Sequence, residues 1–416
     1  MKRLVVAMGM SLGVWACTQD CGAGLPGGLP LPGTNTSRPD ANDTWKVTTP
    51  DPSVENWRGL WVAHADLAYV VGDRGAIARY ENGNWTRVAS GTEENLESVW
   101  GRDVNDIWAV GWNGTVLHST GGDFTVMPTG ITSHLFSVFG SNDVVFMVGA
   151  EGAILTPDAD GGVRVMTDEV TLRSFPVCET RIENPAQNGG ICTTYEIPGE
   201  PGVRYPLCGA PEECCVNPGG TCCYGQRCDP DGGPLIGSVR LDADLKSGWA
   251  SGNFAVACGG GGAIYEWRDG DRGYAWYEMQ LAEGVPFTRD SLVTAWGTSQ
   301  DNVYCAGQDG RLMRREGGDW VPRSIPTPVY VQGLWGTGRR DIYAVGFSGV
   351  VLRYDGFGVG RDAGWYDEDI HVDNHLRAVG GARLDYDGGP RQTPDGGPPP
   401  ARVWVVGSGG VILQKN

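Results

Sequence analysis

Cysteine is the residue type in this chain whose numbers and spacing most clearly indicate chemistry. Of twelve cysteines, eight fall in one Gly- and Pro-rich stretch. They are Cys178, Cys192, Cys208, Cys214, Cys215, Cys222, Cys223 and Cys228. An even number of cysteines in such a segment is typical of a small secreted module held by disulfides, whereas adjacent Cys-Cys pairs disfavour the alternative of a metal cluster. Eight cysteines allow 105 pairings, so the sequence leaves their connectivity open.

The N-terminus indicates export. Lys2 and Arg3 precede an apolar run, Leu4–Trp15, that is too short to span a bilayer stably, so residues 1–16 read as a signal peptide. The segment ends Val-Trp-Ala-Cys17, which resembles a bacterial lipobox with Cys17 as the lipidated residue, although Trp15 is unusual at its position. An ordinary cleaved signal with a nearby cysteine is the alternative.

Residues 17–43 are rich in Gly, Pro, Asn, Ser and Thr and contain almost no large apolar side chain. Such a segment cannot bury a core, so we expect a flexible tether with an end-to-end distance of roughly 30 Å. Cys21 lies within it and has no obvious partner. Thr18 follows the lipobox cysteine, and by resemblance to known sorting rules this favours the outer membrane, on either its periplasmic or its surface side.

Two patterns could bind metal ions. His371 and His375, with Asp367, Glu368 and Asp369 nearby, form the densest group of metal-ligating residue types. They lack the helical context and the Glu of a zinc-protease motif, so we favour a solvated acidic loop and name both histidines only as weak candidates. Asp-x-Asp-Gly-Gly, which begins at Asp158, Asp229 and Asp385, lacks the further acidic positions of a calcium loop, and plain turns are favoured. We expect no cofactor.

Catalytic residues do not stand out. A glycosidase would need an acid, a nucleophile and, for an anionic sugar, an arginine cluster. The arginines are scattered along the chain, and Glu97 is one of few acids in the segments expected to line a centre. Neither a nucleophile elbow, nor a phosphate loop, nor a His-based triad is evident. We therefore expect a protein that is not an enzyme.

These residues are positioned by a repeat. Leu96–Ser119 contains an apolar run ending in Trp100-Gly, then Asp-Ile-Trp-Ala-Val-Gly111, a tight turn, and Gly114-Thr-Val-Leu. The Gly-x-x-Gly feature recurs in seven copies: Gly72/Gly75, Gly111/Gly114, Gly149/Gly152, Gly259/Gly262, Gly307/Gly310, Gly346/Gly349 and Gly407/Gly410. The last Gly of a tight turn supplies positive φ without steric cost. A period of about 40 residues with short β-branched and aromatic runs indicates repeated β-sheets.

Each copy predicts four antiparallel strands, and seven copies predict an all-β, seven-bladed β-propeller. An aromatic residue closes most inner strands, and we interpret this stripe as packing between blades rather than as a ligand-stacking surface. The last copy lacks a fourth strand, but Trp45-Lys-Val-Thr-Thr matches Trp85-Thr-Arg-Val-Ala in pattern. A closed ring leaves no open sheet edge, so we expect this N-terminal strand to complete blade seven.

The pattern VWG…D-[IV]-W-A-V-G-x-x-G-x-[IV]-L resembles bacterial secreted repeat proteins of the sialidase-like and photosystem II assembly factor-like propeller superfamily. The resemblance covers roughly residues 44–177 and 235–416 and implies the fold; activity varies among such propellers. The predicted organisation is a signal peptide (1–16), a tether (17–43), propeller (44–177), a Cys-rich insert (178–228) and propeller again (229–416). Cys258 and Cys305 occupy non-equivalent positions of successive blades, so we expect their side chains on opposite sides of their sheets, as buried free thiols rather than a bridge.

The net charge of the chain limits the classes of binding partner. The formal charge is −18, and losing Lys2 and Arg3 makes it −20, which argues against nucleic acid or anionic lipid. The Gly-x-x-Gly turns and the blade-to-blade links should share one face, and the Cys-rich insert belongs to a link. Because loops on rigid scaffolds often carry function, we expect a lipid-anchored binding or assembly protein that recognises an envelope protein or a polysaccharide there. The alternative is a sialidase-like enzyme that uses the central channel.

Overall fold

The computed structural model describes residues 45–48, 51, 53–166, 243–270, 273–279, 291–328, 330–356, 364–368, 370, 372–384 and 401–415, and the backbone of five short strands between 170 and 222. The expected signal peptide, the tether with Cys17 and Cys21, and His371 lie outside these residues. So do Asp229, Asp385, Cys178, Cys214, Cys223 and Cys228. None of the helices in the described part of the chain has the length and hydrophobicity to cross a bilayer.

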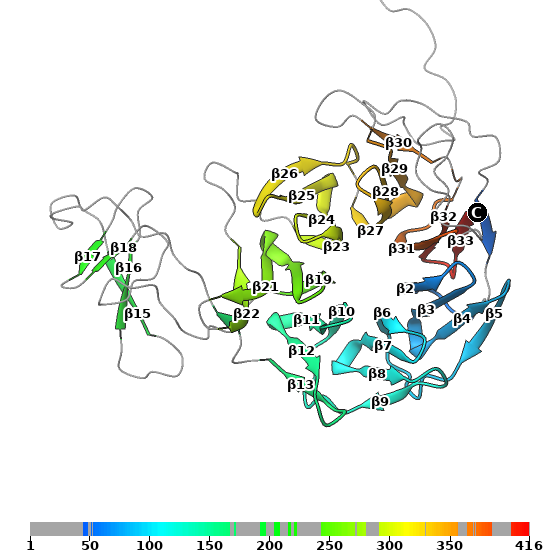
Figure 1. The fold of residues 1–416 in the computed structure, drawn as a ribbon, viewed down its shortest axis with the longest axis horizontal. Coiled ribbons are helices and arrows are strands. Elements are labelled where there is room, and N and C mark those ends of the chain that lie inside the picture. Colours follow the sequence, from blue (N-terminus) through cyan, green and yellow to red (C-terminus); the bar gives the residue numbers. More distant parts are fainter. Residues whose placement is uncertain are drawn as a thin grey trace, which may run out of the picture.

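Seven sheets surround a central channel, and their hydrogen-bonded strand order confirms the predicted all-β, seven-bladed propeller (Figure 1). The innermost strands are β2 (Trp57–His64), β6 (Leu96–Asp103), β10 (Leu135–Gly140), β19 (Leu245–Ser251), β23 (Leu292–Ser299), β27 (Val331–Gly338) and β31 (Leu376–Arg383). The second strands are β3 (Leu67–Gly72), β7 (Asp106–Gly111), β11 (Val145–Gly149), β20 (Phe254–Gly259), β24 (Asn302–Gly307), β28 (Asp341–Gly346) and β32 (Ala401–Gly407).

Two further rings of strands complete the blades. The third strands are β4 (Ile77–Glu81), β8 (Val116–Ser119), β12 (Ile154–Pro157), β21 (Ile264–Gly270), β25 (Arg311–Glu316), β29 (Val351–Tyr354) and β33 (Ile412–Lys415). The outer strands are β5 (Asn84–Val88), β9 (Thr125–Met127), β13 (Val163–Val165), β22 (Gly273–Glu278), β26 (Asp319–Ser324), β30 (Trp365–Asp367) and, in blade seven, β1 (Lys46–Thr48). Short 3-10 turns between second and third strands are η1 (Asp73–Gly75), η2 (Trp112–Gly114), η3 (Ala150–Gly152), η5 (Gly260–Gly262), η6 (Gln308–Gly310) and η7 (Phe347–Gly349).

The two ends of the chain close the ring. Strand β1 pairs antiparallel with β33, with Lys46 opposite Gln414. Side chains reinforce this closure, because Glu368 accepts hydrogen bonds from Trp45 Nε1 (3.0 Å) and from Lys415 Nζ (2.8 Å). Lys415 and Glu368 expose only 4% and 9% of their side chains, so each charge depends on the other in a poorly solvated place.

The core lies between blades. The described residues form seven apolar clusters, one in each interface between neighbouring blades. The second strands are buried on both faces, which explains why they read as continuous apolar runs such as Leu67–Gly72. The aromatic stripe packs between blades as expected: a Cβ on Gly101 would lie 2.6 Å from the Trp61 ring, and one on Gly140 would lie 2.8 Å from the Trp100 ring.

The two Gly positions of each turn serve different needs. The second Gly has positive φ, as at Gly114 (67°), and the residue before it, Asn113, shares this left-handed conformation (52°). The first Gly has extended φ (−167° at Gly111) and is needed for space, because a Cβ there would overlap the carbonyl oxygen of Asn95. The same overlap with the carbonyl that precedes the inner strand recurs in all seven blades.

Cys258 and Cys305 meet in one interface. They face opposite sides of their own sheets, and because their blades are neighbours, both side chains enter the cluster between blades four and five. Both are free and fully buried. Burial, followed by the neighbouring Cys258 thiol, raises the pKa of the Cys305 thiol well above its ordinary value.

The Cys-rich insert leaves the ring at its rim. Strand β14 (Val170–Thr171) pairs in parallel with β22, the outer strand of blade four. The further strands are β15 (Cys192–Glu196), β16 (Arg204–Cys208), β17 (Cys215–Asn217) and β18 (Gly220–Cys222), drawn outside the ring in Figure 1. Strand β14 therefore runs along the edge of blade four, and the expectation that the insert belongs to the face with the Gly-x-x-Gly turns stays a prediction.

The insertion does not separate blades three and four. Glu151 N–H donates to Asp244 Oδ1 (3.1 Å) on one face, and Ser141 Oγ donates to the carbonyl of Gly252 (2.6 Å) on the other. Equivalent contacts join blades without an insert, as where Arg74 N–H donates to Asn95 Oδ1 (2.9 Å). Glu151 and Asp244 are 93 positions apart in the sequence, so the interface between blades three and four is intact although the insert lies between these blades in the chain.

Replacing Gly111 by Ala tests the close approach of turn and inner strand. We expect a loss of about 1–3 kcal/mol in the free energy of unfolding, because the new Cβ forces the Asn95 carbonyl away. Gly122→Ala is the matched control, since a Cβ there meets no atom within 4 Å. Thermal or urea unfolding measures the stability of both variants. Equal effects of the two substitutions would contradict the role given to the close approach at Gly111.

Candidate functional site

A β-bulge near the start of every inner strand builds the candidate site. In each blade the register between the first two strands slips by one residue, as between Leu96 and Ser98. The same slip occurs in the other six blades. The seven bulged residues are Arg58, Glu97, Phe136, Lys246, Val293, Gln332 and Arg377, and all seven line one hollow of about 360 Å³ in the central channel.

The hollow lies at the face that carries the Gly-x-x-Gly turns, because each bulged residue directly follows the residue paired with the first Gly of the turn. Trp57, for example, pairs with Gly72 and is followed by Arg58. A bulge re-aims a side chain that the ladder would otherwise place on a sheet face. We call this ring of seven residues the channel mouth.

The next residue of each inner strand serves structure rather than recognition. At Ser98, Ser247 and Thr294 its hydroxyl joins the inner strand of the following blade. Ser247 Oγ accepts from Ala295 N–H (3.1 Å), and Thr294 Oγ1 accepts from Leu334 N–H (3.2 Å). In blade one this position is Gly59, where a Cβ would lie 2.8 Å from the Cα of Ser98. The seven bulged residues therefore differ in chemistry, whereas the residues that follow them in the inner strands form a layer fixed by packing.

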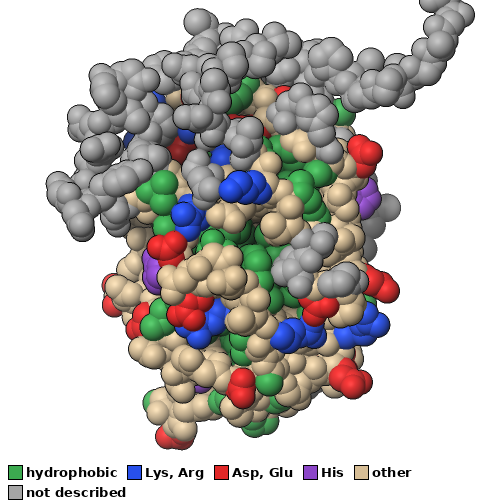
Figure 2. Space-filling view, turned by 90° about the vertical axis from the view of Figure 1, so that its right-hand side faces the viewer, with side chains coloured by type: hydrophobic (Ala, Val, Ile, Leu, Met, Phe, Trp, Pro, Cys, Tyr) green, Lys and Arg blue, Asp and Glu red, His purple; other side chains and the backbone are tan. Residues whose placement is uncertain are grey.

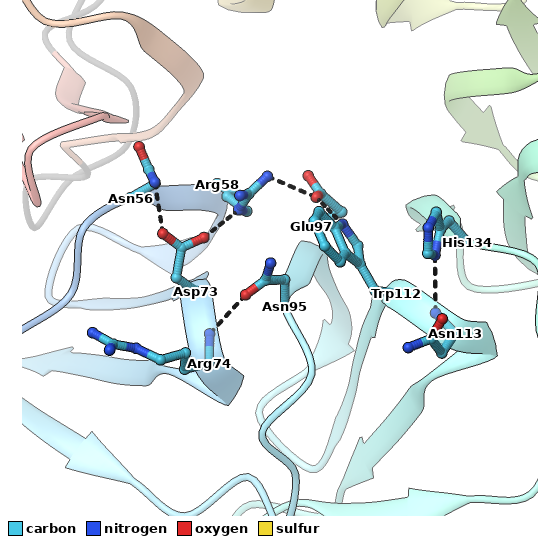
Figure 3. Close-up of polar contacts among 9 residues, drawn as sticks. All are labelled: Asn56, Arg58, Asp73, Arg74, Asn95, Glu97, Trp112, Asn113 and His134. Carbon is cyan, nitrogen blue, oxygen red and sulfur yellow. Dashed lines mark hydrogen bonds and ion pairs between the residues drawn. The ribbon is translucent and has the colours of Figure 1, made fainter.

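Arg58 is the hub of a charged network on one side of the mouth (Figure 3). Its Nε donates to Asp73 Oδ1 (2.7 Å) and its Nη1 donates to Glu97 Oε1 (2.8 Å). Trp112 Nε1 donates to the same Glu97 oxygen (2.7 Å), and the Arg58 guanidinium lies 5.6 Å from the centroid of the Trp112 ring. Asn56 Nδ2 donates to the other Asp73 oxygen (2.6 Å).

Both carboxylates of this network are engaged in ion pairs within it. Both Asp73 and Glu97 are ion-paired to the same arginine, in side chains that are only 10–16% exposed. A nucleophile or general acid needs a carboxyl that is free to reach substrate. The arrangement therefore favours a rigid recognition surface over a pair of catalytic acids.

Lys246 stands across the mouth with partners of its own. Its Nζ donates to Asp244 Oδ2 (2.9 Å) and lies 3.6 Å from the centroid of the Phe136 ring. Burial acts to raise the pKa of Asp244, but the hydrogen bonds from Lys246 and from Glu151 N–H and the charge of Lys246 outweigh it, so the pKa lies below its ordinary value. Asp244 thus joins the mouth to the link between blades three and four.

Arg377 and Gln332, from adjacent inner strands, lack such partners. Among the described residues neither side chain makes a hydrogen bond or ion pair, and Arg377 Nε is buried without an acceptor. Burial lowers the pKa of Arg377, and the nearby positive charge of Arg58 lowers it further. An arginine still stays charged at neutral pH, so this guanidinium is an unmet donor in the hollow.

Aromatic side chains surround the hollow on the same face. Trp112 is 36% exposed, which is high for so large an apolar side chain. Phe347, the first residue of η7, lies 5.6 Å from the Tyr330 ring and 4.6 Å from the His375 ring, measured between centroids. Aromatic residues and arginine are enriched in the central part of a protein-binding surface.

The outer side of the ring differs from the mouth. On the side seen in Figure 2, acidic and basic side chains are intermixed around small apolar areas. Exposed pairs such as Arg79–Glu81 (2.8 Å) contribute little to stability or recognition. The channel mouth is therefore the more distinctive surface.

The predicted metal candidates have structural roles where they are described. His375 Nδ1 accepts from Ser348 N–H (3.2 Å) in the link between blades six and seven. Glu368 pairs with Lys415, and Asp158 accepts from Asp160 N–H (2.9 Å) inside a hairpin turn. Within the described residues no group of three metal-ligating side chains comes together.

Two of the arginines that are scattered along the sequence meet at the mouth. Arg58 and Arg377 are 319 positions apart in the sequence, but closure of the ring brings their strands β2 and β31 side by side. Glu97, the one acid singled out from the sequence, lies beside them. The available sequence signal was the second residue of each inner strand, which reads Arg, Glu, Phe, Lys, Val, Gln and Arg in an otherwise repetitive unit.

Comparison with known proteins agrees on the fold. A solved structure described as "YCF48 bound to D1 peptide" is 13% identical, covers 92% of this chain and 99% of its own, and superposes with a TM-score of 0.54. "YCF48 from Cyanidioschyzon merolae" is 13% identical, covers 90% and 99%, and has a TM-score of 0.50. The shared feature is the propeller. No family model and no curated protein matches the chain.

A double-mutant cycle on Arg58 and Glu97 tests the network at the mouth. We expect Arg58→Met and Glu97→Met to be coupled by about 1–3 kcal/mol in unfolding free energy, because the pair is mostly buried. The exposed pair Arg79–Glu81 serves as the control and should show less than about 1 kcal/mol. Chemical denaturation measures both cycles. Coupling no larger at the mouth than in the control would show that the two residues act independently.

Proposed function

We propose that this protein is a non-catalytic binding or assembly protein of the bacterial envelope, which holds a partner at the channel mouth. The observation that carries the proposal is the ring of seven bulges. These bulges deliver seven side chains of six chemical types to one hollow, while the residues beneath them are fixed by packing. Such a surface presents varied contacts on a rigid frame, as a specific binding site requires.

The partner is a protein or a polysaccharide, and a protein is the stronger candidate. Trp112 is exposed beside Arg58, and Trp and Arg are both enriched at protein interfaces. One structure with this fold is described as bound to a peptide, which lends support by analogy of fold alone.

A sialidase-like enzyme remains the alternative because of one observation: Arg58, Arg377 and Glu97 converge in the channel. The ion pairs of Glu97 and Asp73 with Arg58 weigh against it. Release of free sugar from a panel of sialosides, abolished by Glu97→Gln, would establish the enzyme and overturn the binding proposal.

Membrane anchoring through a lipid on Cys17 is part of the proposal. It is supported by the lipobox-like end of the signal segment and by the tether-like composition of residues 17–43. We expect Cys17→Ser to move the protein from the outer-membrane fraction to the soluble fraction. Cys17→Ser protein that stays membrane-bound would contradict the anchor.

The Cys-rich insert is proposed to be held by disulfides. The backbone register places Cys192 opposite Cys208 and Cys215 opposite Cys222. Directly opposed residues of an antiparallel pair have Cα atoms about 4.5–5.5 Å apart, which suits a disulfide.

Non-reducing peptide mapping tests this pairing. We expect linked peptides containing Cys192 with Cys208 and Cys215 with Cys222. In the same digest Cys258 and Cys305 should be alkylated only when the alkylating agent is added after unfolding, because both are fully buried. Other linkages within the insert would reject the pairing, and alkylation of native Cys305 would contradict its burial.

Partner capture from native envelopes tests the binding proposal. Wild-type protein is compared with Trp112→Ala at the mouth, with Val104→Ala and with a variant lacking residues 178–228. Val104, which is 38% exposed, lies in the β6–β7 turn on the opposite face. Blades three and four touch without the insert, so the deletion should leave the ring intact.

We expect Trp112→Ala to weaken the affinity for the captured partner by tenfold or more, as for an interface hot spot. Val104→Ala should leave this affinity unchanged. Loss of the partner with the deletion would add the insert to the binding surface. If neither the Trp112 variant nor the deletion affected capture, the binding surface could not be assigned to the face with the channel mouth.

A further inference from the structure

Three cations and three carboxylates surround the channel mouth, and they are unequally paired. Arg58 is held by Asp73 and Glu97, and Lys246 is held by Asp244. Arg377, the third cation, has no partner among the described residues, although it is half-buried and its Nε is shielded from water. A buried donor without an acceptor is costly, and native structures generally supply an acceptor.

The geometry leaves room for such an acceptor. Arg377 lines the 360 Å³ hollow together with Gln332 of the neighbouring inner strand, whose side chain also has no hydrogen-bond partner among the described residues. A guanidinium presents paired N–H groups in a planar fork, and an amide adds a further donor. Both donor side chains therefore line a hollow large enough for the end or the side chain of another polypeptide.

We infer that Arg377, assisted by Gln332, binds a carboxylate carried by a peptide partner. The fork of an arginine matches the two oxygens of a carboxylate, with charge-assisted hydrogen bonds stronger than neutral ones. This inference rests on the proposed binding function, and it names the chemical group that the mouth takes. The carboxylate belongs to a chain end or to an Asp or Glu side chain.

The charge around the site limits the ligand. The three carboxylates balance the three cations, so the mouth as a whole is neutral. Two of these carboxylates, Asp73 and Glu97, lie close enough to act electrostatically on Arg377. A dianionic phosphate would add two negative charges beside these carboxylates, whereas a carboxylate adds one. The surrounding Trp112, Tyr330 and Phe347 provide apolar surface for the residues next to the bound group.

Three pools of five-residue peptides, each with a neutral dye and random uncharged positions, test the inference by fluorescence anisotropy with the full-length protein. One pool has a free C-terminal carboxylate, the second is amidated with one Glu, and the third is amidated without an acid. We expect the first or the second pool to bind at least tenfold more tightly than the third, which distinguishes a chain end from a side chain.

Arg377→Gln should remove this preference, and Arg377→Lys should retain part of it because the charge remains without the fork. Arg87→Gln is the matched control, because it makes the same charge change on the outer strand of blade one, where Arg87 pairs with Asp51. Equal binding of all three pools, or a carboxylate preference that survives in Arg377→Gln, overturns the inference.

Stability provides a readout that separates binding from structure. Arg377→Gln removes an unmet buried donor and should be at least as stable as wild type, whereas Arg58→Gln breaks two ion pairs and should be less stable. If Arg377→Gln lost as much stability as Arg58→Gln, Arg377 would have a structural role, and the inference would be overturned.

The binding proposal can survive the failure of this inference. If envelope capture depends on Trp112 while the peptide pools bind equally, the mouth holds its partner through other groups. Binding of sialyllactose that is lost in Arg377→Gln would instead assign the site to an acidic glycan and overturn the peptide assignment.

Discussion

The structure depends on a close approach between backbone atoms, repeated once in each blade. The first glycine of every Gly-x-x-Gly turn lies against the carbonyl that precedes the inner strand, and no side chain fits between them. This contact fixes where each turn meets the channel. The bulge follows at the next residue and sends one side chain into the hollow. A requirement for small residues in the turn thus determines where the chemically variable residues of the site lie.

A second constraint operates between blades. Aromatic rings from one inner strand cover glycines of the next, as Trp61 covers Gly101 and Trp335 covers Gly381. Blade seven carries Gly380 in place of the aromatic residue, and Leu60 and Val62 of blade one fill the space. The interface between blades seven and one is therefore packed differently from the others. Strand β1 completes blade seven, and the Glu368–Lys415 pair joins that blade to the link from blade six.

The sequence was sufficient to predict the ring because each unit repeats its turn glycines and its strand pattern. Strand order, blade number and the packing role of the aromatic residues all follow from local patterns. The channel mouth could not be predicted in the same way, because a bulge is defined by the register between two strands. Arg58 and Arg377 became neighbours only through closure of the ring. Cys258 and Cys305 show a similar limit, since opposite orientations in successive blades were predicted, but only the structure shows that both thiols face the interface between these blades.

The intact interface beneath the Cys-rich insert has a consequence for how the ring tolerates a break in its chain. Glu151 and Asp244 remain in contact although they are 93 positions apart in the sequence, and Ser141 and Gly252 join the same blades on the other face. A cut within the insert would yield two polypeptides, with blades one to three and the closing strand on one and the remaining strands on the other. These pieces would share two large interfaces, between blades three and four and around β1 and β33. Packing and hydrogen bonds, rather than continuity of the chain at this position, hold blades three and four together.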